Sequence, residues 1–336
     1  MYEIRGVIRA IKLPWKQISK EGGGFPLNTV KRRTVQASIL ARIYGNVNAD
    51  EVIGTRVTLK KMYSTTGEVL PFVSARAIKY SIRQALKERG YEVDPFLEDP
   101  QATEALRLRD SGRPDRYIDN DLFGYMVTMG RREQAVRRQA PISFSYLRAL
   151  KDTPIVTEFA ARFPRSLETG SNPVPFEVEV ADFLGKLNCL IYDYVGDFSI
   201  DKRQPGAPQD LPEKLPEEER RRRLRDFLEV LLTPAYVLPR RTNSLNLPEY
   251  YASLVTLSYG PLPIYQYFDY DLEEDTVNPE KLDSLKKLRP FADGNCQAIL
   301  IDYKGVVKDS RGIRISSLSE AIDEILEFYF KPEKEA

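Results

Sequence analysis

The sequence predicts an α+β fold, and three observations lead to that class. Apolar or alternating runs predict strands, for example at 35–44 and 250–259. Apolar residues three and four positions apart predict amphipathic helices at 74–89 and 317–330. The chain has 336 residues, of which 42% are hydrophobic, enough for a large core.

The first half of the chain alternates short strands with loops. The helix from Ser74 to Arg89 ends before Gly90, a residue that favours helix termination. A triple-glycine run, Gly22 to Gly24, marks an N-terminal loop. We predict strands at 2–13, 35–44, 57–63 and 121–127, an extended segment at 140–149, a loop at 14–33 and an irregular insertion at 95–117.

The second half begins with an excursion of low periodicity at 151–176. Acidic residues at 217–219 open a helix that continues to Leu232, and they suit the positive end of its dipole. We predict strands at 188–196, 250–259 and 297–302, a surface loop at 202–219, a weak helix at 284–288 and a closing amphipathic helix at 317–330. No internal repeat is visible.

With the insertions set aside, the predicted order is strand, helix, strand, strand, helix, strand. This is the ferredoxin-like βαββαβ arrangement of RNA-recognition folds. Fold alone does not assign function. We therefore expect one domain, 1–336, with a core at about 1–13, 35–90, 119–130 and 183–260, insertions at 14–34 and 91–118, and a C-terminal extension at 271–336.

Composition narrows the function classes. The net charge is +1, so any affinity for nucleic acid has to come from local patches. The chain contains no histidine, which excludes a Ser-His-Asp triad, a His-dependent ribonuclease and an H-E-x-x-H protease. The spacing of Cys189 and Cys296 fits neither a disulfide framework nor a zinc site. Carboxylate-metal chemistry remains possible, although the missing histidines make an enzyme less expected. We expect a soluble cytoplasmic protein without a cofactor or a membrane segment.

The helix at 74–89 carries the first candidate site. Arg76, Lys79 and Arg83 fall within roughly 60° of one another on a helix. Ser74 can cap the helix and leaves backbone N–H groups at its start. This stripe suits a polyanion backbone. The alternative is an ordinary solvated helix face.

Other basic or amide-rich segments add to this pattern. Small and amide residues on a turn let a ligand backbone approach closely, although the same turn can simply join two strands. Guanidinium groups suit phosphate. The further candidate RNA contacts are Arg42, Asn46 and Asn48 at such a turn, Arg131, Arg132, Arg137 and Arg138 in one cluster, and Arg240 and Arg241 in a basic loop. The run Arg220 to Arg223 follows three glutamates, and we interpret it as a solvated face.

Two pairs of acidic positions could mimic a metal site. Asp119 and Asp121 flank Asn120, and Asp50 precedes Glu51. Two acidic residues at such a spacing far more often lie on the same face of a strand than bind a common metal ion. We therefore predict no metal site. The aromatic residues show no paired signature on strands, so the sequence does not support base stacking by sheet aromatics.

Five segments in order resemble the Cascade backbone subunit of the DevR type, a CRISPR-associated family of type I-B and related systems. The resemblance covers roughly residues 35 to 260. The segments are Phe72–Tyr80, Asp119–Met126, Arg138–Ser145, Asn172–Glu177 and Ile191–Gly196.

This resemblance implies a hand-shaped antiviral subunit that polymerises head to tail along a CRISPR RNA. The palm would hold the guide by its backbone and leave it exposed to pair with target DNA. A thumb at about 151–177 would kink the RNA, with Phe159 or Phe163 as its wedge. Further Cascade subunits and a recruited helicase-nuclease would be partners, and this subunit would not cleave.

Two other functions remain open. One is a backbone subunit of the type III kind that cleaves target RNA with a loop aspartate, such as Asp50, and a divalent metal. The other is a free-standing RNA-binding regulator.

Overall fold

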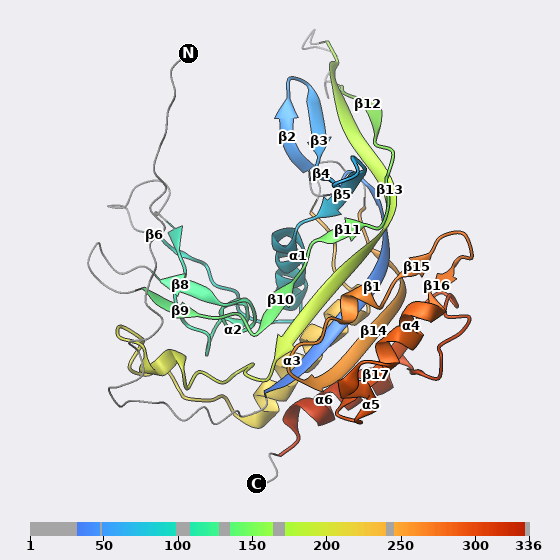
Figure 1. Ribbon diagram of the computed structural model, residues 1–336. Helices are drawn as coiled ribbons and strands as arrows, with labels where there is room; N and C mark the ends of the chain where they lie inside the picture. The colour runs from blue at the N-terminus through green and yellow to red at the C-terminus, as the bar shows by residue number, and fades with distance from the viewer. Residues whose placement is uncertain are drawn as a thin grey trace, which may run out of the picture. The chain divides into compact units, whose positions relative to one another are not determined.

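The computed structural model describes residues 32–47, 49–98, 108–127, 135–163, 172–239 and 245–332. All of them belong to one compact unit that begins at Arg32, and Figure 1 shows the course of the chain. The strand predicted at 2–13 and most of the loop predicted at 14–33 lie outside these residues.

A large mixed sheet forms the centre of the unit. Its middle strand β1 (Arg33–Gly45) pairs antiparallel with β13 (Val174–Tyr192) on one side and with β14 (Glu249–Tyr259) on the other. The strand order is β18-β17-β14-β1-β13-β11-β5-β4. The outer strands are β4 (Lys61–Tyr63), β5 (Val69–Val73), β11 (Leu147–Ala149), β17 (Cys296–Asp302) and β18 (Arg314–Ile315). Strand β10 (Ile142–Phe144) also pairs with β13.

Strand β13 is long enough to belong to two sheets. Its second part pairs with β1, whereas its first part pairs with β12 (Val156–Arg162) and with β3 (Arg56–Leu59). Strand β2 (Ala49–Ile53) extends this second sheet as a hairpin with β3. Figure 1 shows this group of strands at the far end of β13 from the C-terminal helices. The segment predicted as an excursion at 151–176 therefore contains β12 and the start of β13.

Three helices cover one face of the main sheet. They are α1 (Ala75–Glu88), α3 (Glu217–Leu232) and α6 (Leu318–Phe330). Ile78, Ile82 and Phe227 are fully buried there against alternate residues of β1 and β13. Ser317 and Glu320 form a reciprocal capping box at the start of α6. The predictions at 74–89, 217–232 and 317–330 are confirmed.

The opposite face is covered only in part by the C-terminal region. Leu40 of β1 and Leu254 of β14 pack there against Phe268 and Leu282 in a second buried cluster. The covering elements are η4 (Ile264–Gln266), β15 (Tyr270–Asp271), β16 (Thr276–Val277), α4 (Pro279–Lys286) and α5 (Arg289–Ala292). The predicted strand at 297–302 is confirmed, and the weak helix predicted at 284–288 begins earlier, at Pro279.

The strand predicted at 121–127 is wrong. Residues Ile118–Phe123 form α2, and only Tyr125–Val127 form a strand, β8, which pairs with β9 (Val136–Arg138) outside the main sheet. Gly124 separates the two elements with φ +74°. A Cβ there would lie 2.5 Å from the carbonyl oxygen of Arg138, so only glycine fits this turn. On the side of β13 away from β1, the strands that pair with it are β10 and β11.

Two small elements complete the described unit: the pair β6 (Leu97–Glu98) and β7 (Leu108–Arg109), and the turn η3 (Asp201–Arg203). None of the described helices combines the length and the apolar character needed to cross a membrane.

Candidate nucleic-acid interface

The cationic stripe of α1 exists, but its three members differ in what they contact. Arg76 is exposed and forms no ion pair within the described ranges. The Lys79 ammonium lies 5.4 Å from the ring centroid of Phe123. Arg83 donates its Nε to Asp119 at 2.9 Å. The stripe therefore changes along the helix from an unpaired cation to one held in an internal ion pair.

Lys79 combines partial burial with a positive charge. Burial lowers the pKa of its ammonium, and repulsion from Arg83 adds to this effect. The aromatic face of Phe123 offsets a part of that cost by a cation–π contact. A phosphate placed beside this ammonium would compensate its charge and favour the protonated form.

The start of α1 presents further positive potential. Ser74 caps the helix by accepting the backbone N–H of Ala77 at 3.3 Å. No acidic residue occupies the first turn, so the positive end of the helix dipole is not offset within α1. Because β5 ends at Val73, this helix terminus lies at the edge of the sheet. Arg76, Lys79 and the helix start are thus brought together, as predicted.

The structure adds aromatic residues that the sequence analysis did not assign. Phe72 of β5 and Tyr146 stack with their ring centroids 5.0 Å apart. Their positions are far apart in sequence, and only the pairing of β5 with β11 makes them neighbours. The sequence offered one indication of these aromatic residues: Phe72 lies two positions before Ser74, the residue that caps α1.

The turn after β1 contributes less than predicted. Arg42 donates two hydrogen bonds to Asp182, at 2.8 and 2.5 Å, so its charge is already matched. Asn46 is buried and donates its Nδ2 to the carbonyl oxygen of Glu179 at 2.6 Å. Asn48 lies outside the described residues. Arg42 lies within β1 and Asn46 in the turn that follows, and the bonds of both side chains connect this part of the chain to β13.

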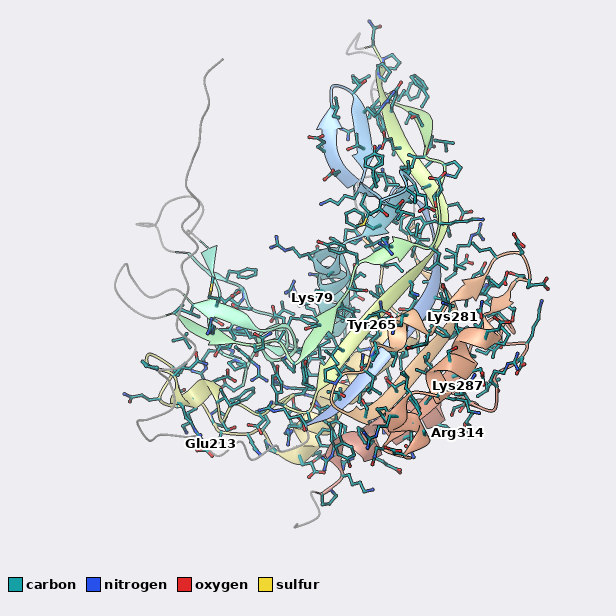
Figure 2. The ribbon with its side chains drawn as sticks, in the orientation of Figure 1. Lys79, Glu213, Tyr265, Lys281, Lys287 and Arg314 are labelled. Atoms are coloured by element: carbon teal, nitrogen blue, oxygen red, sulfur yellow. The ribbon has the colours of Figure 1, made fainter. Side chains whose placement is uncertain are left out.

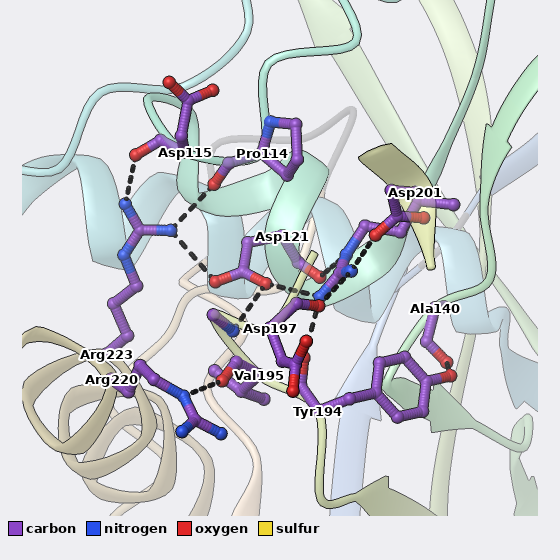
Figure 3. Close-up of polar contacts among 12 residues, drawn as sticks. Pro114, Asp115, Asp121, Ala140, Tyr194, Val195, Asp197, Asp201, Arg220 and Arg223 are labelled. Atoms are coloured by element: carbon purple, nitrogen blue, oxygen red, sulfur yellow. Dashed lines mark hydrogen bonds and ion pairs between the residues drawn. The ribbon is translucent and has the colours of Figure 1, made fainter. Parts of the chain in front are cut away.

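Arg138 is an internal residue, which removes it from the candidate contacts. Its guanidinium contacts Asp121 at 2.7 Å and Asp201 at 2.5 Å, and its side chain is 2% exposed. Figure 3 shows this network, which also includes Arg223 at 2.9 Å from Asp121 and the backbone of Tyr194 and Gly196. Two arginines and two aspartates thus fasten β9, α2, α3 and the segment after β13 to one another. Arg137, next in the chain, is exposed without an ion pair in the part that the structure describes.

In the arginine run of α3, Arg221 and Arg222 form a solvated face, whereas Arg220 is half-buried and donates its Nε to the carbonyl oxygen of Val195 at 2.8 Å. Arg221 pairs with Glu217 at 2.7 Å and Arg222 with Glu219 at 2.8 Å, as predicted. Arg223 differs, since it is buried against Asp121.

The remaining predicted basic contacts, Arg131, Arg132, Arg240 and Arg241, lie outside the described residues. The two proposed wedge residues are described. Phe159 on β12 is 72% exposed, and Phe163 just after this strand is 74% exposed. Both side chains are therefore accessible to a partner.

Three of the four acidic positions, Asp50, Asp119 and Asp121, belong to ion pairs. The Asp50 carboxylate lies 3.6 Å from the Lys60 ammonium. It borders a hollow of about 380 Å³ between the β2–β3 hairpin and β13, where Arg56 pairs with Glu177 and Lys61 with Glu179. Within the described residues, no three cysteine or acidic side chains are grouped so that they could hold a metal.

Comparisons with known proteins give one family from a family model and a similar fold from solved structures. A family model described as "CRISPR-associated negative auto-regulator DevR/Csa2" matches residues 34–236. Two solved chains align over 88% of this chain and 100% of their own length, each at 11% identity. One comes from a "CRISPR RNA-guided surveillance complex, pre-nicking" with a TM-score of 0.57, and the other from a "CRISPR RNA-guided surveillance complex" with a TM-score of 0.52. No curated protein matches the chain. At this identity, the solved chains are evidence for the fold alone.

Proposed function

The chain belongs to the DevR/Csa2 family of CRISPR-associated proteins, and from this premise we propose that it is a non-catalytic, RNA-binding backbone subunit of a Cascade surveillance complex. It would polymerise head to tail along the CRISPR RNA in the cytoplasm and present the guide to target DNA. Other Cascade subunits and a helicase-nuclease would complete the machinery.

The observation that carries the RNA-binding role is the graded stripe of α1. Arg76 is an exposed and unpaired cation within the described unit, Lys79 is partly desolvated, and both lie beside a helix start without acidic residues. A guide of arbitrary sequence has to be held by contacts to phosphate and ribose. These groups offer such contacts without reading a base.

The topology supports a ferredoxin-like palm. The adjacent strands run in the order β14, β1, β13, β10, all antiparallel. Helix α1 lies between β1 and β10 in the sequence, and α3 lies between β13 and β14. Strand β12 and the start of β13 would then belong to the thumb at about 151–177, inside a single hand-shaped domain.

The RNA recovered with the protein tests this function. We expect the full-length chain, expressed together with its CRISPR locus, to carry RNA of one uniform length. Bound RNA of mixed length and origin, or one cellular transcript, would instead indicate the free-standing regulator. The control is the Arg76→Ala, Lys79→Ala variant, which should lose this RNA.

The cleaving alternative has a separate test. Assembled complex incubated with complementary RNA and magnesium should leave that RNA intact. Periodic cuts that disappear in the Asp50→Ala variant would overturn the non-catalytic assignment.

A further inference from the structure

One stretch of the sheet is uncovered on the face opposite α1. It is formed by β5 and β11, and it adjoins the part of β13 where Lys186 contacts the C-terminal residues Tyr265 and Phe268. We call it the open face and define it by Phe72, Tyr146 and Arg148, with Lys186 of β13 and Lys281 of α4 at its border. Figure 2 labels Lys281 and Tyr265 on the C-terminal side of this region.

Strand register puts three of these side chains in one row. Phe72 is the partner of Arg148 across β5 and β11, and Arg148 is the partner of Lys186 across β11 and β13. Directly paired residues project on the same side of a sheet. Val73 and Leu147, one position along, are buried against the helices, so the row faces the other way.

The cations of the open face are poorly matched by acidic groups. Some exposed arginines elsewhere have carboxylate partners, such as Asp182 for Arg42 and Glu177 for Arg56. Arg148 and Lys281 are exposed, and neither forms an ion pair with any residue that the structure describes.

The pKa of Lys186 is affected by this excess of positive charge. Its ammonium donates to the carbonyl oxygens of Tyr265 and Phe268, and Asp269 lies 3.9 Å away. Burial is the main reason that the pKa of Lys186 is lowered. Attraction from Asp269 opposes that shift, and repulsion from Arg148 and Lys281 increases it. Lys186 therefore lies near two further cations and one carboxylate.

An aromatic platform lies beside these cations. Tyr146 is 52% exposed, and its ring stacks on Phe72 at an interplanar angle of 28°. The stacking leaves one face of the tyrosine ring for a further flat group. A cationic track beside an aromatic ring is the usual arrangement for binding a single strand without sequence preference.

We infer that the open face is a second contact region for the same single-stranded RNA, which passes from α1 around the β5–α1 junction, stacks a base on Tyr146 and places a phosphate at Arg148. Continuity supports the single strand as occupant, because Phe72 and Ser74 flank Val73 and so connect the two regions directly. This inference rests on the proposed function and adds residues that it does not use.

The test combines binding with a positional readout on the full-length chain. Single-stranded RNA of about the same length and of unrelated sequence is titrated against the wild type and the variants. Tyr146→Ala should weaken binding roughly 5- to 100-fold, the usual effect of removing one stacked base, whereas Tyr146→Phe should bind like the wild type. Arg148→Ala should reduce the slope of log affinity against log salt by about 0.7. The matched control, Arg221→Ala on α3, should leave both quantities unchanged.

Ultraviolet crosslinking of the wild-type complex gives evidence that does not depend on how the variants fold. We expect a crosslinked peptide that contains Tyr146. If Tyr146→Ala and Arg148→Ala bind like the wild type and no crosslink maps to this peptide, while Arg76→Ala is impaired, the inference fails and the proposed function stands. If the wild type binds no RNA, both fail.

Discussion

Arg83 donates its Nε to the Oδ2 of Asp119 at 2.9 Å, and this ion pair fastens α1 to α2. Asp119 also accepts the backbone N–H of Asp94 at 3.0 Å. The third cation of the α1 stripe therefore stabilises the fold, while the first two remain for a ligand. Periodicity along a helix could not separate these roles, because the partner of Arg83 lies 36 residues away.

The affinity for RNA should depend on pH through Lys79. Burial lowers the pKa of its ammonium in the free protein, and a bound phosphate would raise it again. Binding then takes up a proton, so affinity is highest below the free-protein pKa and falls as the pH rises through it. We expect affinity to decrease as the pH rises through this lowered pKa, at a pH below the ordinary pKa of lysine, measured by titration at constant ionic strength.

The control for this pH dependence is Lys79→Arg, because arginine stays charged throughout this range. Its affinity should change less with pH than that of the wild type. An identical pH dependence in both proteins would show that Lys79 does not contact the phosphate.

The buried ionic network should matter for stability. Asp121 is fully buried and holds both Arg138 and Arg223. Asp121→Asn keeps the shape of the side chain and removes its charge, which leaves two buried arginines with less compensation. We expect the free energy of unfolding to fall by about 3–5 kcal/mol, measured by urea denaturation.

The matched control for Asp121 is Asp182→Asn, which breaks the exposed ion pair with Arg42. This change should cost less than about 1 kcal/mol. Equally small decreases in both variants would contradict the structural role that we give to the network.

The exposed phenylalanines should act on assembly and leave folding intact. Phe159 and Phe163 are mostly exposed, so Phe159→Ala with Phe163→Ala should change the free energy of unfolding by less than about 0.5 kcal/mol each. If they form the wedge, the complexes should shorten or become uneven in length, measured by native mass spectrometry. Complexes of wild-type mass and RNA length would remove both residues from the thumb assignment.

Local patterns predicted the helices and the central strands well. The segments 74–89 and 317–330 carry serine caps and apolar spacing, and 217–232 carries an acidic first turn and apolar spacing, so they could be found without knowledge of the sheet. The error at 121–127 arose because α2 is buried all round, so its residues show no helical alternation between polar and apolar positions. A short buried run of this kind is equally consistent with a strand.

The candidate site was predictable only where local sequence determines it. The stripe and cap of α1 could be found from spacing alone. Arg138 could not be recognised as internal, because its partners Asp121 and Asp201 come from two other segments. For the same reason, the sequence could not predict the row formed by Phe72, Arg148 and Lys186. This row depends on the register between three strands that are distant in sequence.

The most direct test of the central claim compares RNA affinity across unrelated sequences of one length, at several salt concentrations, for the wild type and for Arg76→Ala with Lys79→Ala. We expect equal affinity for every sequence and a salt slope that falls by about 0.7 for each phosphate that the variant no longer binds. A strong preference for one sequence, or an unchanged slope in the variant, would contradict backbone recognition by α1.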